Sequence, residues 1–180
     1  VPSLSLFLFD NQGHFVRRVD EYDKSKFIPG YYMEIDRLPA GTYNCIVWGG
    51  LDTADSFYYI SDGSSSTASC DLVIGVTKMD DLQLRLKSRE VTRSTKHYVD
   101  NIPTNLFHGS ALSIELKPAT SPDPVVIPLE KNSKQINVSI KGLSKLQGQS
   151  DPYSYADFWV EAPNGWYSLK NELNSNSYSY

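Results

Sequence analysis

The pattern of apolar and polar positions along the chain predicts β-strands. Residues 4–9 form an apolar run broken only by Ser5, whereas residues 31–38 and 111–116 alternate apolar with polar side chains, as strands with one buried face do. No stretch sustains the 3.6-residue apolar period of an amphipathic helix. We therefore expect an all-β chain of antiparallel sandwiches, with further strands at residues 72–74, 82–86, 125–127, 136–140 and 158–162.

Residues 38–51 predict the central strand, around which the other strands must pair or pack. A Pro/Gly turn at Gly41 leads into a β-branched and aromatic run, and Gly49 begins a glycine pair that predicts the next reversal. We expect Gly41 to adopt a positive φ angle that most residues avoid. Trp48 is assigned to the core, and Tyr43 lies in the same strand.

A tight turn is predicted between the first two strands. Asp10-Asn11-Gln12-Gly13 contains the residue types that turns favour, and Phe15 begins an apolar return strand. This pattern predicts a β-hairpin with Gly13 in its turn.

A proline-rich segment predicts a domain boundary. Residues 118–124 concentrate prolines, which cannot donate to a β-ladder and hold the chain extended. The sequence then divides into an N-terminal β-sandwich at 1–117, a linker at 118–124 and a second β domain at 125–180, either complete or truncated. The second unit is near the size at which a lone core becomes marginal.

Composition and charge exclude several partners. A hydrophobic content of 40% suffices for a core, and a net charge of -4 without a basic stripe argues against nucleic acid as a partner. No apolar run approaches the about 20 residues of a membrane-spanning helix. The sequence begins at Val1 rather than Met, so we expect a targeting segment upstream.

The sequence contains no recognisable catalytic, metal or cofactor motif. None of His14, His97 and His108 has another histidine or a cysteine at helical spacing, and Cys45 is far from Cys70. Serines lack the Gly-x-Ser-x-Gly context, and the glycines lack a phosphate-binding pattern. We expect no catalytic residue, no metal site and no cofactor.

Other polar motifs have structural explanations. The pairs Asp52/Asp55 and Asp80/Asp81 fit solvated turns better than calcium loops. The triplet that begins at Asn137 matches a glycosylation site but lies within an alternating strand. For the cysteines, a Cys45–Cys70 disulfide and two separately buried thiols remain open alternatives.

Aromatic residues suggest a binding surface. With 12 Tyr and 3 Trp, the chain has more rings than a small core requires, and such rings stack on sugars or anchor protein interfaces, although cross-strand packing is the commoner use. The candidates are Tyr58, Tyr59, Tyr153, Tyr155, Trp166, Tyr167, Tyr178 and Tyr180.

Five segments together resemble one protein family. They are Leu8-Phe9-Asp10-x-x-Gly13-x-Phe15-Val16, Leu38-Pro39-Ala40-Gly41-Thr42-Tyr43, Val47-Trp48-Gly49-Gly50, Leu106-Phe107-His108-Gly109 and Ile127-x-Leu129-x-Lys131-Asn132. In this order they resemble the fimbrillin-associated anchor proteins of Bacteroidetes. The matching residues Gly13, Gly41, Tyr43, Trp48, Gly49 and Gly109 are turn, strand and core residues, so they are structural rather than catalytic.

The resemblance implies a fold, a role and a location. It implies two transthyretin-like antiparallel β-sandwich domains in a non-enzymatic, exported outer-membrane lipoprotein of the cell surface. It implies tethering or terminating a fimbria, with fimbrial pilin subunits as partners and a lipidated cysteine upstream of Val1 as the membrane attachment. A surface glycan-binding β-sandwich lipoprotein is the alternative that the aromatic residues favour.

Overall fold

The chain folds as antiparallel β-sheets, as the sequence predicts. The computed structural model describes residues 1–51, 57–61, 70–86, 89–90, 97–98, 105–117, 123–132, 137, 139 and 165–173. The strands are β1 (Leu4–Asp10), β2 (Phe15–Glu21), β3 (Gly41–Gly49), β4 (Phe57–Ser61), β5 (Leu82–Leu86), β6 (Arg89–Glu90), β7 (His97–Tyr98), β8 (Phe107–Leu116), β9 (Glu130–Lys131) and β10 (Trp166–Ser168). Two short 3-10 helices, η1 (Lys24–Lys26) and η2 (Met79–Asp81), interrupt them. Among these residues, no helix has the length and apolarity needed to cross a membrane.

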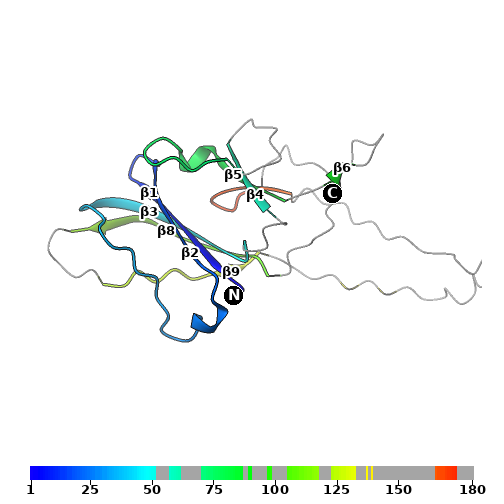
Figure 1. Ribbon diagram of the computed structural model, residues 1–180, viewed down its shortest axis with the longest axis horizontal. Coiled ribbons are helices and arrows are strands. Elements are labelled where there is room, and N and C mark those ends of the chain that lie inside the picture. Colours follow the sequence, from blue (N-terminus) through cyan, green and yellow to red (C-terminus); the bar gives the residue numbers. More distant parts are fainter. Residues whose placement is uncertain are drawn as a thin grey trace, which may run out of the picture.

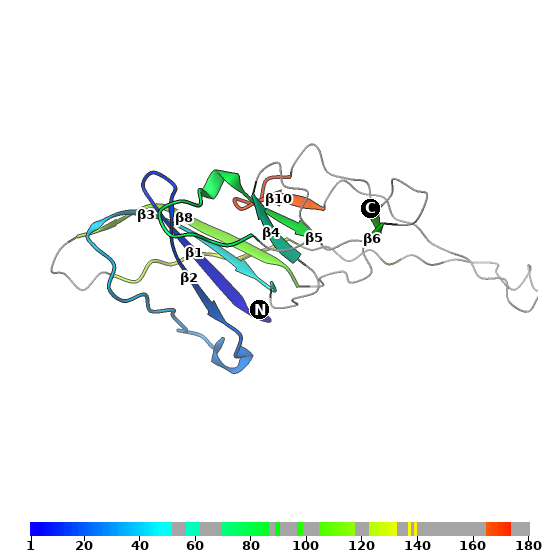
Figure 2. The same cartoon turned by 45° about the horizontal axis from the view of Figure 1, so that its top comes forward.

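The strand at Gly41–Gly49 is central, which confirms its predicted position. The main sheet has the order β2-β1-β3-β8-β9, so β3 pairs with β1 on one side and β8 on the other. The predicted hairpin is also present as β1 and β2. A second sheet, of order β10-β5-β4, forms another layer over the first (Figures 1 and 2), and β6 pairs with β7.

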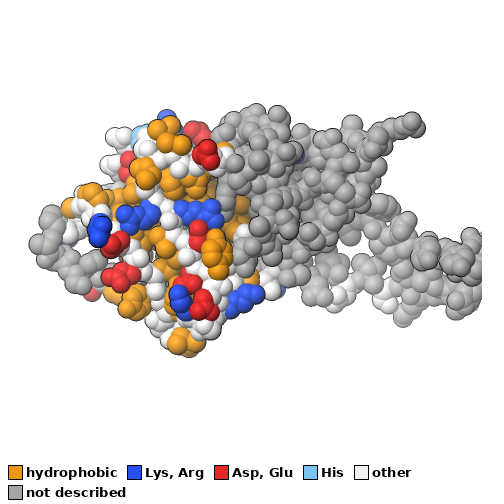
Figure 3. All heavy atoms as spheres, in the orientation of Figure 1, with side chains coloured by type: hydrophobic (Ala, Val, Ile, Leu, Met, Phe, Trp, Pro, Cys, Tyr) orange, Lys and Arg blue, Asp and Glu red, His pale blue; other side chains and the backbone are white. Residues whose placement is uncertain are grey.

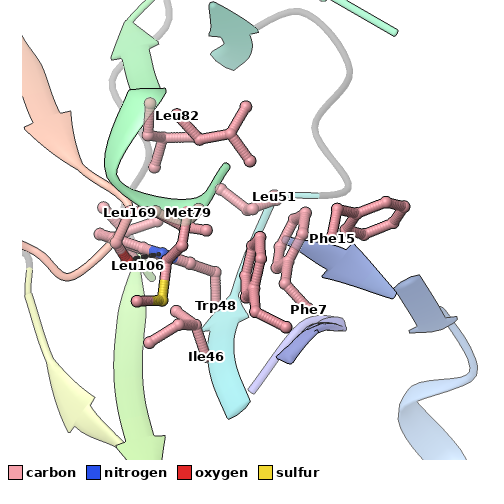
Figure 4. Packing of buried hydrophobic residues seen from close by; sticks show 11 residues of the cluster. Phe7, Phe15, Ile46, Trp48, Leu51, Met79, Leu82, Leu106 and Leu169 are labelled. Atoms are coloured by element: carbon pink, nitrogen blue, oxygen red, sulfur yellow. Dashed lines mark hydrogen bonds between the residues drawn. The ribbon is translucent and has the colours of Figure 1, made fainter. Parts of the chain in front are cut away.

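The first core lies between these two layers. Figure 4 shows Phe7, Ile46 and Trp48 of the main sheet facing Leu82 and Leu169. All five side chains are fully buried. Burial of such large apolar side chains is the dominant stabilising term in a small sandwich.

A second core lies on the opposite face of the main sheet. Strand β1 contributes Leu4, Leu6 and Leu8 to this face and Phe7 and Phe9 to the other, which explains why nearly all of its residues are apolar. Two extended segments, 27–38 and 125–129, cover this face with half-buried side chains: Phe27, Tyr31, Met33, Ile35, Leu38, Ile127 and Leu129.

The covering segments correct two predicted strands. Residues 31–38 alternate in burial as expected, but they pack through side chains on the sheet and form no strand. Residues 125–127 are also extended without being a strand; they are flanked by Pro124 and Pro128, which lack the N–H that a ladder needs, and β9 begins only at Glu130.

Two further strand predictions need correction. Residues 72–74 form a loop and turn rather than a strand, because their backbone bonds close a turn at Gly75. Strand β8 begins at Phe107, earlier than the predicted 111, since Phe107 pairs with Gly49. Within β8 the alternating pattern of 111–116 does not bury every apolar residue, because Leu112 is exposed at a register shift.

The described strands beyond position 124 join the sheets formed by earlier residues. Strand β9 pairs with β8, β10 pairs with β5, and Leu169 belongs to the first core. Residues 118–122 and most of 133–164 lie outside the described residues. The division into 1–117, 118–124 and 125–180, with two transthyretin-like domains, therefore stays a prediction.

No disulfide joins Cys45 and Cys70, so of the alternatives left by the sequence the separate thiols hold, although Cys70 is only half-buried. Cys45 is buried in the second core, whereas Cys70 packs against the first. The main sheet separates these two cores, so the thiols lie on opposite sides of it. Burial raises the pKa of Cys45 to about 12.

Candidate functional site

The six motif residues gather at two ends of the main sheet rather than in one cleft. Gly13, Gly41 and Tyr43 lie near the β1–β2 turn, since Gly41 begins β3 and Tyr43 pairs with Asp10. Trp48, Gly49 and Gly109 lie at the other end of β3, where Val47 pairs with Gly109.

The β1–β2 turn is closed by the side chain of Asp10. Its Oδ1 accepts the amides of Gln12 at 2.9 Å and His14 at 2.8 Å, and Gly13 has φ 80°. Desolvation raises the pKa of Asp10, but the amide bonds from His14 and Gln12 outweigh it and leave that pKa below its usual value. Gly13 therefore serves the turn, because its left-handed backbone favours glycine.

Tyr43 closes the loop that leads into β3. Its hydroxyl donates to the Pro39 carbonyl at 2.8 Å, four residues upstream, and its ring is buried. This contact resembles the tyrosine corner of β-sandwiches. The predicted positive φ of Gly41 is wrong: the left-handed glycines are Gly13, Gly30, Gly50 and Gly75 among the described residues.

Gly41 is also not required by space. A Cβ atom there would lie 3.7 Å from the Tyr43 ring, an ordinary contact. Gly41 begins β3 as an ordinary extended residue, and the loop geometry is held by the Tyr43–Pro39 bond instead.

Trp48 connects the main sheet to the C-terminal segment. Its Nε1 donates to the Leu169 carbonyl at 2.9 Å, and its ring meets His108 edge-on with centroids 4.8 Å apart. Burial lowers the pKa of His108, although the Leu169 carbonyl and Glu130 oppose this shift.

The remaining motif glycines allow close approach of other segments. A Cβ atom at Gly49 would lie 2.7 Å from Val1 Cγ1, and one at Gly109 would collide with the Pro128 carbonyl. Gly109 thus lets the 125–129 segment lie against β8, while Gly49 lets the first residues cross the end of β3. The motif residues build a scaffold.

The structure describes the side chains of two of the aromatic candidates, Trp166 and Tyr167, and both pack against other residues of the fold. On β10, half-buried Tyr167 stands beside Trp48 with ring centroids 6.2 Å apart, and the Arg85 guanidinium lies 4.8 Å from the Trp166 ring centre. Tyr58 and Tyr59 are in β4, but their side chains are not described. Tyr153, Tyr155, Tyr178 and Tyr180 lie outside the described residues.

Within the described residues, no group of three His, Cys, Asp or Glu side chains could hold a metal ion. Asp80 forms an ion pair with Lys170 at 2.6 Å, and Asp52 and Asp55 lie outside the described part. The two histidines with described side chains are apart as well: His14 pairs with Asp10, whereas His108 is beside Trp48.

Exposed apolar side chains are the feature that sequence analysis missed. The turn around Gly75 exposes three aliphatic side chains: Val73, Ile74 and Val76. The region near η1 exposes Tyr22, Ile28 and Tyr32. The apolar run at 72–74 predicts a strand, so the exposure of Val73 and Ile74 was not expected. The glycine at position 75 was the available signal for a turn.

Solved structures share this fold. A candidate adhesin from Bacteroides ovatus is 20% identical with a TM-score of 0.68, and the match covers 100% of this chain and 54% of that one. A candidate polysaccharide-binding protein from Bacteroides thetaiotaomicron VPI-5482 is 19% identical with a TM-score of 0.63, covering 99% of this chain and 56% of that one. A candidate adhesin from the same strain has a TM-score of 0.57 at 19% identity, over 100% and 54% of the two chains.

The chain thus spans about half the length of these solved relatives, with 54% and 56% coverage of the first two. No curated protein matches it significantly. The sequence profile of the family described as fimbrillin-A associated anchor proteins Mfa1 and Mfa2 matches residues 1–180. The chain belongs to this family of fimbrillin-A associated anchor proteins.

Proposed function

We propose that the protein is a non-enzymatic structural component of the cell surface that tethers or terminates a fimbria at the outer membrane. The observation that carries this proposal is the family match, which extends over residues 1–180. Its partners are fimbrial pilin subunits, and its membrane attachment is a lipidated cysteine upstream of Val1.

The geometry of the described residues supports a scaffold. The family's motif positions are occupied by a buried indole at Trp48, a hydroxyl–carbonyl bond from Tyr43 and glycines at close contacts. Each of these groups contributes to packing or to a turn, so their role is structural. Such a protein contributes rigid docking surface rather than catalysis.

A fractionation experiment tests the tethering role. We expect the full-length precursor to partition with outer membranes, and replacement of its upstream cysteine by serine to release folded protein and detach fimbriae from cells. A stable anchor needs several acyl chains, so loss of the lipid should release the protein completely. Precursor without lipid, or a cysteine variant that keeps its membrane attachment and fimbriae, would contradict the proposal.

A glycan-binding role is the second candidate. One structural relative is described as a candidate polysaccharide-binding protein, and exposed Tyr22 and Tyr32 offer rings that could stack on sugars. A glycan array with the purified protein separates the two candidates. An array signal that is lost in the Tyr22→Ala and Tyr32→Ala variants would support glycan binding. A wild-type signal no higher than background would rule out the glycan-binding role.

A further inference from the structure

One turn presents three branched aliphatic side chains to solvent. Val73, Ile74 and Val76 are 48%, 71% and 68% exposed, and we call these three residues the aliphatic tip. The segment that leads into β5 is green in Figure 1 and passes the β1–β2 turn. Figure 3 shows hydrophobic side chains at the surface there.

The aliphatic tip is held rigidly by backbone hydrogen bonds. The Val73 carbonyl accepts the amides of Val76 at 3.1 Å and Thr77 at 3.0 Å, and Thr77 Oγ1 accepts the Val73 amide at 2.9 Å. The turn is also fixed to β2, because Gly75 donates to the Phe15 carbonyl at 2.8 Å and Phe15 donates to Thr77 at 2.7 Å. A surface held in this way loses little conformational entropy when it binds.

Folding does not explain these side chains. Tight turns favour Gly, Asn, Asp, Ser and Pro. In residues 73–76 only Gly75, with φ 73°, fits that preference. Valine and isoleucine left in water contribute nothing to the core, whose side chains lie elsewhere. Departures from local sequence rules concentrate at functional sites, and clustered exposed apolar side chains mark contact surfaces.

The position of the aliphatic tip indicates which partner it meets. Strand β1 has 7 residues and runs from the N-terminal side to the turn beside the tip, a length of about 20 Å. If the protein is attached upstream of Val1, the tip points away from the membrane.

We propose that the aliphatic tip docks into an apolar pocket of a fimbrial subunit. This inference rests on the proposed fimbrial function and names the surface that performs it. A convex group of three branched side chains fits a concave pocket, and its fixed backbone supplies the preorganisation that tight docking requires.

A matched pair of variants tests the contact. V73T/I74T/V76T keeps the branched shapes and the turn but replaces one methyl or ethyl group of each side chain with a polar one. V125T/V126T makes the same change at two other exposed valines, which are 50% and 85% exposed. Binding of each purified full-length variant to the fimbrial subunit purified from the same source is measured by calorimetry, with melting curves checking the fold.

We expect V73T/I74T/V76T to bind the fimbrial subunit at least about tenfold more weakly than wild type, because several buried apolar groups are lost. V125T/V126T should bind as wild type does. Thr77→Ala keeps the aliphatic tip but removes the Oγ1 contact, so we expect an intermediate loss.

Other outcomes overturn the inference in distinguishable ways. If wild type and V73T/I74T/V76T bind the subunit equally, the tip is not the contact, although the fimbrial function stands. If wild type binds no fimbrial subunit, both proposals fail. If wild type binds phosphatidylethanolamine/phosphatidylglycerol vesicles and V73T/I74T/V76T does not, the tip contacts lipid instead.

Discussion

The indole Nε1 of Trp48 donates a 2.9 Å hydrogen bond to the carbonyl of Leu169, which lies 121 positions further along the chain. This bond fixes the segment after β10 against the central strand. Leu169 itself is fully buried in the same core as Trp48. The stability of the first core therefore depends on residues from both ends of the chain.

Trp48→Ala should lower the free energy of unfolding by about 3 to 5 kcal/mol, because a large ring leaves a cavity between two sheets. Trp48→Phe retains most of the packing but leaves the buried Leu169 carbonyl short of a donor, at a cost of about 1 to 3 kcal/mol. Denaturant unfolding measures both values. Trp166→Phe, at a half-buried tryptophan, is the matched control and should cost less. A loss below about 1 kcal/mol for Trp48→Ala would contradict the buried position.

Two strand glycines should respond differently to alanine. Gly109→Ala brings a Cβ onto the Pro128 carbonyl, so the 125–129 segment must move, at a cost of about 1 to 3 kcal/mol. Gly41→Ala meets only the Tyr43 ring at 3.7 Å and should change stability by about 0.5 kcal/mol or less. Thermal unfolding of the pair checks this, and equal melting temperatures would show that the 125–129 segment does not lie against β8.

Local signals predicted the hairpin and the central strand correctly. Asp10 and Gly13 specify the turn through their own side-chain and backbone chemistry, and the apolar run ending at Trp48 specifies a buried strand. Such features depend only on neighbouring residues. They can therefore be predicted from a single sequence.

Features that depend on distant partners were missed. Gly41 was expected to need a positive φ, but the Tyr43–Pro39 bond holds that loop. Residues 31–38 alternate like a strand because one side faces the second core, yet their cover of the sheet needs no ladder. The exposure of Ile74 was also not predicted, because a short β-branched sequence has the same pattern in a strand and in a hydrogen-bonded turn.

Acidification should weaken the first core through His108. Burial lowers the pKa of this histidine, so its neutral form is favoured in the folded protein. As the pH falls below about 6.5, the unfolded chain binds a proton that the folded protein resists, and stability falls. Above that pH, the contribution is constant.

The measurement is the unfolding free energy between pH 7.5 and 5.5. We expect His108→Phe to flatten this dependence, whereas Trp166→Phe, which leaves the Trp48–His108 contact in place, should retain it. Wild-type protein whose stability rises on acidification through this window would contradict the predicted sign.

The two thiols should differ in reactivity and form no disulfide with each other. Cys45 is buried in the second core and its pKa is raised to about 12, so almost no thiolate exists at neutral pH. Half-buried Cys70 should react faster with a thiol reagent in the native protein. Unfolding in denaturant without reductant should expose both thiols to labelling, because the main sheet keeps them on opposite sides. Cys70→Ser, which leaves Cys45 alone, identifies the faster thiol. An unfolded, unreduced protein in which neither thiol is labelled would mean that the two are joined, and the separation of the two cores by the main sheet would then be wrong.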